Sequence, residues 1–301
     1  MDWNTAEEIA RFDALWKLRG QHCHVSSWNR RADDWEQELR HSSMHREKNA
    51  FRVDSAAAFL RSHGLLGSGD QVIDIGCGLG RFAAEFAKTA GHVTAADLSE
   101  QMLCHGRAFA EEEGLENLTF TACDFRNADL DALGWKDRFD LVFTSLSPAV
   151  SCGADLERLE YISRGWCAYQ TFACTCEPVG QAIADRLFPG VPRYSHKDGR
   201  SYYAAFNLLW LRGRFPLTHQ YCESRVERLP AGMPLANKIA RQLPQEAVTE
   251  EILERIYRCV MESADPEGMI DYPSDYWYGI LLWNVKETYP RDYRTEGAIF
   301  P

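Results

Sequence analysis

The sequence contains no run of about 18 apolar residues, so it predicts no transmembrane helix. Its start, Met1-Asp2-Trp3-Asn4, lacks a basic region followed by an apolar stretch, so we expect no secretory signal peptide. Basic residues are outnumbered: 33 Lys and Arg against 44 Asp and Glu give a formal net charge of -11. This balance argues against a dedicated nucleic-acid binder, which normally carries a basic face.

Cys and His pairs at zinc-finger spacing are also missing, so no metal site is predicted. The 10 cysteines include one close pair, Cys174 and Cys176, whose sulfurs would share one face of a strand. In a chain of 301 residues without an export signal, buried reduced thiols explain the cysteines better than disulfides do. We therefore expect a cytoplasmic protein.

Glycine, by contrast, is concentrated at one informative place. Gly76, Gly78 and Gly80 come at every second position, directly after the β-branched run of residues 72–75. Glycines allow a sharp bend and the close approach of a ligand where a Cβ would clash. The first N–H groups of the helix that follows would face that ligand, as in a mononucleotide-binding turn.

Strands and helices alternate after residue 53. A helix is predicted over 53–63, a second over 79–90 and a third from Ser99, which is a good N-cap. Five strands are predicted between them, at 71–75, 92–97, 118–123, 139–144 and 166–173. Late strands at 217–229 and 276–285, with a helix over 249–262 between them, would complete seven. The pattern predicts an α/β fold with a doubly wound, mostly parallel, seven-stranded sheet.

The chain is predicted to have two parts. Residues 1–52 form an N-terminal helical arm, with two helices split around Gly20 and four of the nine tryptophans of the chain. This arm either packs on the main domain or closes over a ligand as a lid, and we expect a mixture of both. Residues 53–301 form the main domain, in which segments at about 180–216 and 231–270 are available to shape a substrate pocket.

Acidic residues follow three successive predicted strands: Asp74, Asp97 and Asp124. With the glycine turn of residues 74–80, with Leu98, Ser99 and Met102 after Asp97, and with Phe125 after Asp124, they cover roughly residues 70–150. In order and spacing this constellation resembles the class I S-adenosylmethionine-dependent methyltransferases. The resemblance implies the family's Rossmann-like fold and S-adenosylmethionine as cofactor.

The resemblance also implies a role for each matching residue. Gly76, Gly78 and Gly80 would give room to the amino-acid portion of the cofactor, with Asp74 near its ammonium group. Asp97 would accept hydrogen bonds from both ribose hydroxyls. The remaining positions would contact the adenine or ribose, or line the floor beneath the reactive methyl group: Leu98, Met102, Asp124, Phe125 and Ser145.

A nicotinamide dinucleotide site is the competing interpretation, because it also needs a glycine turn and a carboxylate about 20 residues later. Its fingerprint needs a glycine or alanine at the sixth position for close helix–strand packing. That position is Arg81, which is too bulky for this contact. The methyltransferase interpretation is therefore favoured.

The sequence carries fewer signals for the methyl acceptor than for the cofactor. The segment after the fourth strand, Ser145-Leu146-Ser147-Pro148, lacks the Asn/Asp-Pro-Pro-aromatic sequence of nucleic-acid amino-methylating enzymes. We expect a small-molecule acceptor, contacted by Trp28, Arg31 and Ser147, and name no catalytic residue. The alternatives are an RNA or other nucleic-acid methyltransferase and a non-catalytic S-adenosylmethionine-binding protein.

Overall fold

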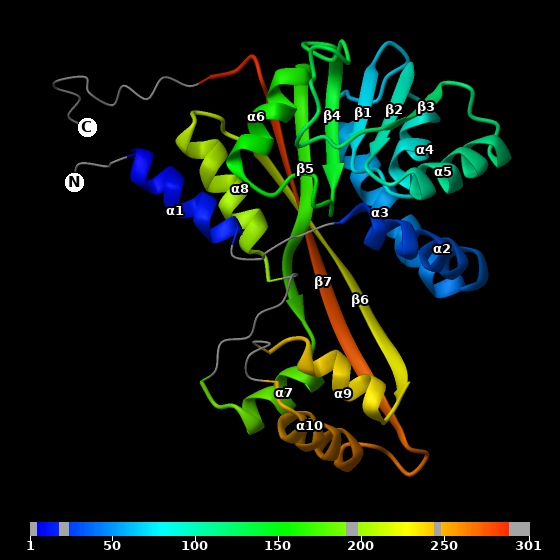
Figure 1. The fold of residues 1–301 in the computed structure, drawn as a ribbon, viewed down its shortest axis with the longest axis vertical. Coiled ribbons are helices and arrows are strands. Elements are labelled where there is room, and N and C mark those ends of the chain that lie inside the picture. The colour runs from blue at the N-terminus through cyan, green and yellow to red at the C-terminus, as the bar shows by residue number, and fades with distance from the viewer. Residues whose placement is uncertain (1–4, 18–23, 191–197, 244–247, 289–301) are drawn as a thin grey trace. The chain divides into compact units, whose positions relative to one another are not determined.

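The protein is described by a computed structural model that covers residues 5–17, 24–190, 198–243 and 248–288 (Figure 1). The chain divides into two compact units. The first unit comprises Met1–Thr171, Ser201–His219 and Ile280–Pro301, and the second comprises Phe172–Arg200 and Gln220–Gly279. No helix among the described residues is both long enough and apolar enough to cross a membrane.

A seven-stranded sheet has the strand order β3-β2-β1-β4-β5-β7-β6. Its strands are β1 (Gln71–Ile75), β2 (His92–Asp97), β3 (Leu118–Ala122), β4 (Phe139–Ser145), β5 (Ser163–Cys176), β6 (Leu217–Pro230) and β7 (Met269–Asn284). The pairs β1–β2, β1–β4, β2–β3 and β4–β5 are all parallel. The order reverses between β1 and β4, and open α/β sheets bind ligands at such a switch point, beyond the carboxyl ends of the strands.

The β6 edge of the sheet is antiparallel. Within the second unit, Ala231 bonds to Gly268, Arg228 to Asp271 and Arg225 to Ser274, so the residue numbers rise along one strand as they fall along the other. The sheet is therefore mixed but mostly parallel. This confirms the predicted α/β class with seven strands.

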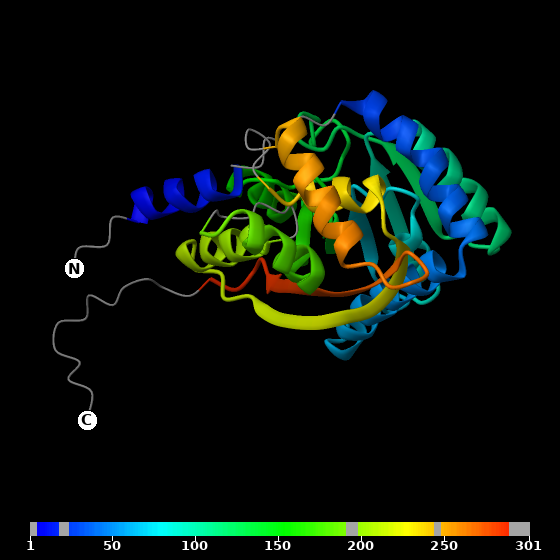
Figure 2. The ribbon, with the colours of Figure 1, turned by 90° about the horizontal axis from the view of Figure 1, so that it is seen from below.

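Among the described residues, these helices belong wholly or mainly to the first unit: α1 (Thr5–Lys17), α2 (Val25–His41), α3 (Ser43–Ser62), α4 (Arg81–Ala87), α5 (Glu100–Glu112), α6 (Gly153–Ile162) and α8 (Arg200–Leu211). Figure 2 shows α2 running beside α5. Phe143 of β4 packs edge-on against Phe86 of α4, with ring centroids 5.0 Å apart. Three further helices, α7 (Pro178–Leu187), α9 (Met233–Ala240) and α10 (Glu250–Glu262), pack together in the second unit.

Some predicted bounds were wrong. The helix predicted over 79–90 is the shorter α4, because Gly80 at its N-cap has a left-handed φ of 70°. The predicted boundary between residues 52 and 53 lies inside α3, one helix of 20 residues. The predicted break at Gly20 lies outside the described residues. β5 and β7 are longer than the strands predicted over 166–173 and 276–285.

The segments predicted to shape a substrate pocket divide between the two units. Segment 180–216 contains α8, whose buried residues belong to the core of the first unit: Ala204, Ala205, Leu208 and Leu209. Segment 231–270 forms α9 and α10, which pack in the core of the second unit. Their role in a substrate pocket stays a prediction.

Candidate functional site

The turn after β1 is held tightly to its neighbours. The N–H of Gly76 donates to the carbonyl of Ala96 over 2.7 Å, which ties the turn to β2. Gly76 has a φ of +70°, and a Cβ there would stand 1.8 Å from Oγ of Ser147. Only glycine therefore allows the loop after β4 to lie against this turn.

The other two glycines of the turn differ in what surrounds them. A Cβ on Gly80 would meet the Phe120 ring of β3 at 2.9 Å, so Gly80 serves close packing of the helix start on the sheet. A Cβ on Gly78 would meet no protein atom within 4 Å, although its φ is +53°. Gly78 thus leaves open space beside the backbone, as a cofactor-binding turn requires.

Asp74 is a buried carboxyl group in the central strand, 1% exposed. Its Oδ2 has no hydrogen-bond partner among the described residues. Burial raises the pKa of Asp74 to about 8, and the negative charge of Asp97 adds to this rise. A backbone hydrogen bond from Ala83 opposes the rise. Because a buried carboxyl group with one unpartnered oxygen is costly, a cation bound beside it would be strongly favoured.

Asp97 ends β2 and faces the same turn. Its Oδ2 accepts a hydrogen bond from the N–H of Gly78 and its Oδ1 one from the N–H of Ser99, each 2.8 Å long. Burial raises the pKa of Asp97, and these backbone hydrogen bonds oppose the rise. Each carboxylate oxygen can accept more than one hydrogen bond, so the group is held in place and can still bind two hydroxyls.

The end of β4 and the loop that follows it form a third side of the candidate site. Oγ of Ser145 is buried and has no hydrogen-bond partner among the described residues. Leu146 has a φ of 52°, a conformation that is strained for a residue with a side chain. Oγ of Ser147 accepts a hydrogen bond from the N–H of Ala149 over 3.2 Å and lies against Gly76.

The residues predicted to contact the adenine or ribose are spread between surface and core. Leu98 is 36% exposed, whereas Met102 is 1% exposed in a cluster with Ala32 and Leu79. Asp124 is exposed and accepts a hydrogen bond from Asn127 over 2.8 Å. Phe125 is only 3% exposed and belongs to the core of the first unit. Their contacts with a nucleoside stay predictions.

The arm approaches these turns through α2. Trp28 packs on the cluster of Ala32, Leu79 and Met102, and the Arg31 guanidinium lies 5.0 Å from the Trp28 ring. Asn29, which sequence reasoning did not single out as a site residue, accepts a hydrogen bond from Ser99 over 2.6 Å. The contact joins residues 70 positions apart, so no local pattern could have identified it. The predicted substrate contacts of Trp28, Arg31 and Ser147 stay predictions.

Metal ligands are not gathered anywhere in the described part of the chain: no group of three or more His, Cys, Asp or Glu side chains could hold an ion there. The cysteines described are all free. Burial raises the pKa of the Cys77 thiol, beside the glycine turn, well above its usual value, so this thiol stays protonated and unreactive.

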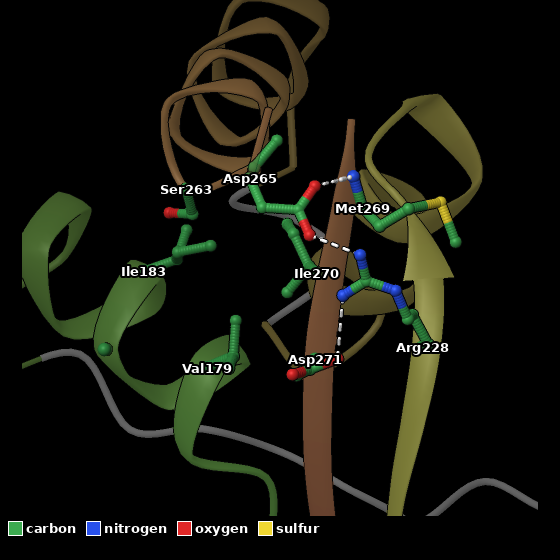
Figure 3. Close-up of a pocket in the computed structure, with 10 residues that line it drawn as sticks. Val179, Ile183, Arg228, Ser263, Asp265, Met269, Ile270 and Asp271 are labelled. Carbon is green, nitrogen blue, oxygen red and sulfur yellow. Dashed lines mark hydrogen bonds and ion pairs between the residues drawn. The ribbon is translucent and has the colours of Figure 1, made fainter. Parts of the chain in front are cut away.

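A cavity of about 430 Å³ lies within the second unit (Figure 3). Val179, Ile183 and Ile270 form its apolar wall. Arg228 lies at its side and pairs with Asp265 at 2.6 Å and Asp271 at 3.2 Å. The cavity contains none of the predicted site residues, although parts of both predicted pocket-shaping segments line it.

The residues at the switch point fit the predicted cofactor. The buried carboxyl group of Asp74, with Oδ2 unpartnered among the described residues, suits its ammonium group, and the fixed carboxylate of Asp97 suits two ribose hydroxyls. The open space at Gly78 lies between them in the chain. These features come from β1, β2 and the turn that joins β1 to α4.

Known proteins were compared with the chain. The 23S rRNA (uracil(1939)-C(5))-methyltransferase RlmD of Hahella chejuensis is 40% identical over 57 residues, 19% of this chain and 13% of that protein. The malonyl-[acyl-carrier protein] O-methyltransferase of Erwinia billingiae is 34% identical over 89 residues, 29% of this chain and 32% of that protein. The chain thus spans less than a third of the length of these curated relatives.

The comparison extends to solved structures and to family models. Magnesium protoporphyrin IX methyltransferase (ChlM) from Synechocystis PCC 6803, solved with bound SAH, has a TM-score of 0.44 and 17% identity, over 93% of this chain and 98% of that chain. The family model described as "Methyltransferase domain" matches residues 66–257, more than half of the chain. The resemblance predicted from the sequence is thereby confirmed: the chain belongs to the methyltransferase domain family.

Proposed function

We propose that this protein transfers the methyl group of S-adenosylmethionine to a small-molecule acceptor. The family assignment supports the predicted enzyme class, and S-adenosylmethionine is the cofactor that the resemblance implies. The observation that carries the proposal is the arrangement at the carboxyl ends of β1 and β2, where Asp74 and Asp97 flank the open space at Gly78.

Bound S-adenosylmethionine supplies a methyl group already activated by a positively charged sulfonium. The residues of the chain therefore have to bind and orient the cofactor and the acceptor and to exclude water, rather than supply a strong nucleophile. Asp97 would hold the ribose through charge-assisted hydrogen bonds, and Asp74 would hold the ammonium group in its ionised form. The Ser145 hydroxyl, buried at the end of β4 without a hydrogen-bond partner among the described residues, would line the floor beneath the methyl group. No residue is assigned as a base.

The small-molecule acceptor is supported by charge and by the loop after β4. A formal charge of -11 disfavours the phosphate contacts that supply much of the affinity for RNA or DNA. Residues 145–150 contain one proline and no aromatic side chain that could clamp a base. We also propose a cytoplasmic location, for which the free cysteines of the described chain are the support.

The test is methyl transfer from radiolabelled S-adenosylmethionine into a fractionated cell extract. The proposal expects label in the low-molecular-mass fraction, and the matched Asp97→Ala variant should lose this signal. Label in the RNA fraction, removed by nuclease, would instead favour a nucleic-acid methyltransferase. Binding without transfer to any fraction would favour a non-catalytic binding protein.

A further inference from the structure

One face of α2 carries a row of side chains that contact α4, α5 and the turns before these helices. Asn29, Ala32, Asp33, Glu36 and Arg40 follow the spacing of three to four residues that brings side chains onto one helical face. All five lie on the predicted arm, and all five contact α4, α5 or the turns that precede these helices.

The first contact reaches the turn that holds Asp97. Oγ of Ser99 donates to Oδ1 of Asn29 over 2.6 Å, and the N–H of Ser99 donates to Oδ1 of Asp97 over 2.8 Å. Ser99 is fully buried and also caps α5 by accepting from the N–H of Met102. Asn29 therefore fixes the serine whose backbone orients the predicted ribose-binding carboxylate.

The second contact reaches the glycine turn. Glu36 is 4% exposed and bonds to Arg81 over 2.7 Å and to Arg40 over 2.6 Å. Arg81 is the first residue of α4, directly after Gly80, and its guanidinium lies 3.5 Å from the centre of the Phe109 ring of α5. Breaking such a buried pair leaves an uncompensated charge, so Glu36 holds α2 firmly to the turn.

Apolar and exposed polar contacts complete the attachment. Ala32, Leu79 and Met102 form a small buried cluster between the two contacts. On the exposed side, Asp33 pairs with His105 at 2.8 Å, and Arg40 pairs with Glu112 at 2.9 Å. Exposed pairs contribute little, so Asn29 and Glu36 are the polar contacts that matter most.

We propose that α2 holds the two cofactor-binding turns in their binding geometry, with Asn29 and Glu36 as positioning residues that slow cofactor release. This inference rests on the proposed function. Each residue acts through another: Asn29 through Ser99 on Asp97, and Glu36 through Arg81 on the glycine turn. Loosening either contact lets α2 lift, which frees the turns and speeds dissociation.

The experiment measures the dissociation rate of S-adenosylhomocysteine by stopped-flow displacement, using the full chain. Glu36→Gln should accelerate dissociation by about tenfold or more, and Asn29→Ala by about three- to tenfold. Asn29→Asp keeps an oxygen acceptor for Ser99 and should restore a rate near that of the wild type. Asp34→Asn, a matched charge change at an exposed position of the same helix, should leave the rate unchanged.

The unfolding midpoint of each variant without ligand separates positioning from folding. A purely structural role would lower the midpoint of Glu36→Gln or Asn29→Ala without changing dissociation relative to Asp34→Asn, and that result would overturn the inference. Wild-type protein that binds no S-adenosylhomocysteine would refute the proposed function, and this inference with it. If the wild-type protein binds S-adenosylhomocysteine and the variants release it at the wild-type rate, the inference alone would be refuted.

Discussion

Cofactor binding should expel a proton from Asp74. This buried carboxyl group, whose Oδ2 has no partner among the described residues, has a pKa raised to about 8 by burial and by the charge of Asp97, so it is mostly neutral at pH 7 before the cofactor binds. The ammonium group of the cofactor favours the ionised form. Affinity for S-adenosylhomocysteine should therefore rise with pH wherever Asp74 is protonated in the free protein.

The size of the effect follows from the titration. With a pKa of about 8, about 1% of Asp74 is ionised at pH 6 and about 10% at pH 7, so the Kd should fall about tenfold between these values. Titration calorimetry in two buffers with different ionisation enthalpies should count nearly one proton released per ligand at pH 7. The amino group of the ligand stays largely protonated over this range.

Asp74→Asn provides the control, because an amide cannot release a proton. Its Kd should be nearly independent of pH between 6 and 7, and its proton release should vanish. A flat wild-type profile would refute the reasoning. So would an Asp74→Asn variant that keeps the tenfold slope, because the proton would then come from another group.

Three further predictions follow from the same site. Asp97→Ala should weaken S-adenosylhomocysteine binding by about 100-fold in calorimetry, because two charge-assisted hydrogen bonds are lost, while the circular dichroism spectrum stays that of a folded protein; unchanged affinity would exclude the ribose role. Gly78→Ala should weaken binding and lower the free energy of unfolding only by the roughly 1–2 kcal/mol cost of its left-handed φ, whereas Gly80→Ala should lower that free energy more, since its Cβ would meet Phe120 at 2.9 Å; equal free energies of unfolding would contradict this contrast. Without ligand, the wild-type unfolding midpoint should fall as pH rises from about 4 towards 8, because folded Asp74 keeps a proton that the unfolded chain has lost; Asp74→Asn should flatten that fall, and an identical slope would assign it to other groups.

Local patterns predicted the parallel half of the fold well. β1 and β2 begin and end where the sequence placed them, and each is a short strand with four consecutive buried residues. Ser99 caps α5 as predicted, and Thr249 caps α10 in the same way, each accepting from a backbone N–H three residues later. These features depend on neighbouring residues, so the sequence alone specifies them.

Features that depend on residues far apart in the chain could not be predicted from the sequence. β7 begins at Met269, but Pro273 and Asp275 in its first half are typical of turns, so only its aromatic second half was predicted. Arg81 was judged too bulky for a dinucleotide site, yet its partner Glu36 lies 45 positions away and could not be inferred. Pairings of this kind depend on how helices pack, which no local period encodes.

The most direct test of the central claim is a crystal structure of the protein with S-adenosylhomocysteine. The account predicts both ribose hydroxyls within about 3 Å of the Asp97 carboxylate and the amino group of the ligand beside Asp74, over the open space at Gly78. A ligand bound away from the carboxyl ends of β1 and β2, or a folded protein that takes up none, would contradict it.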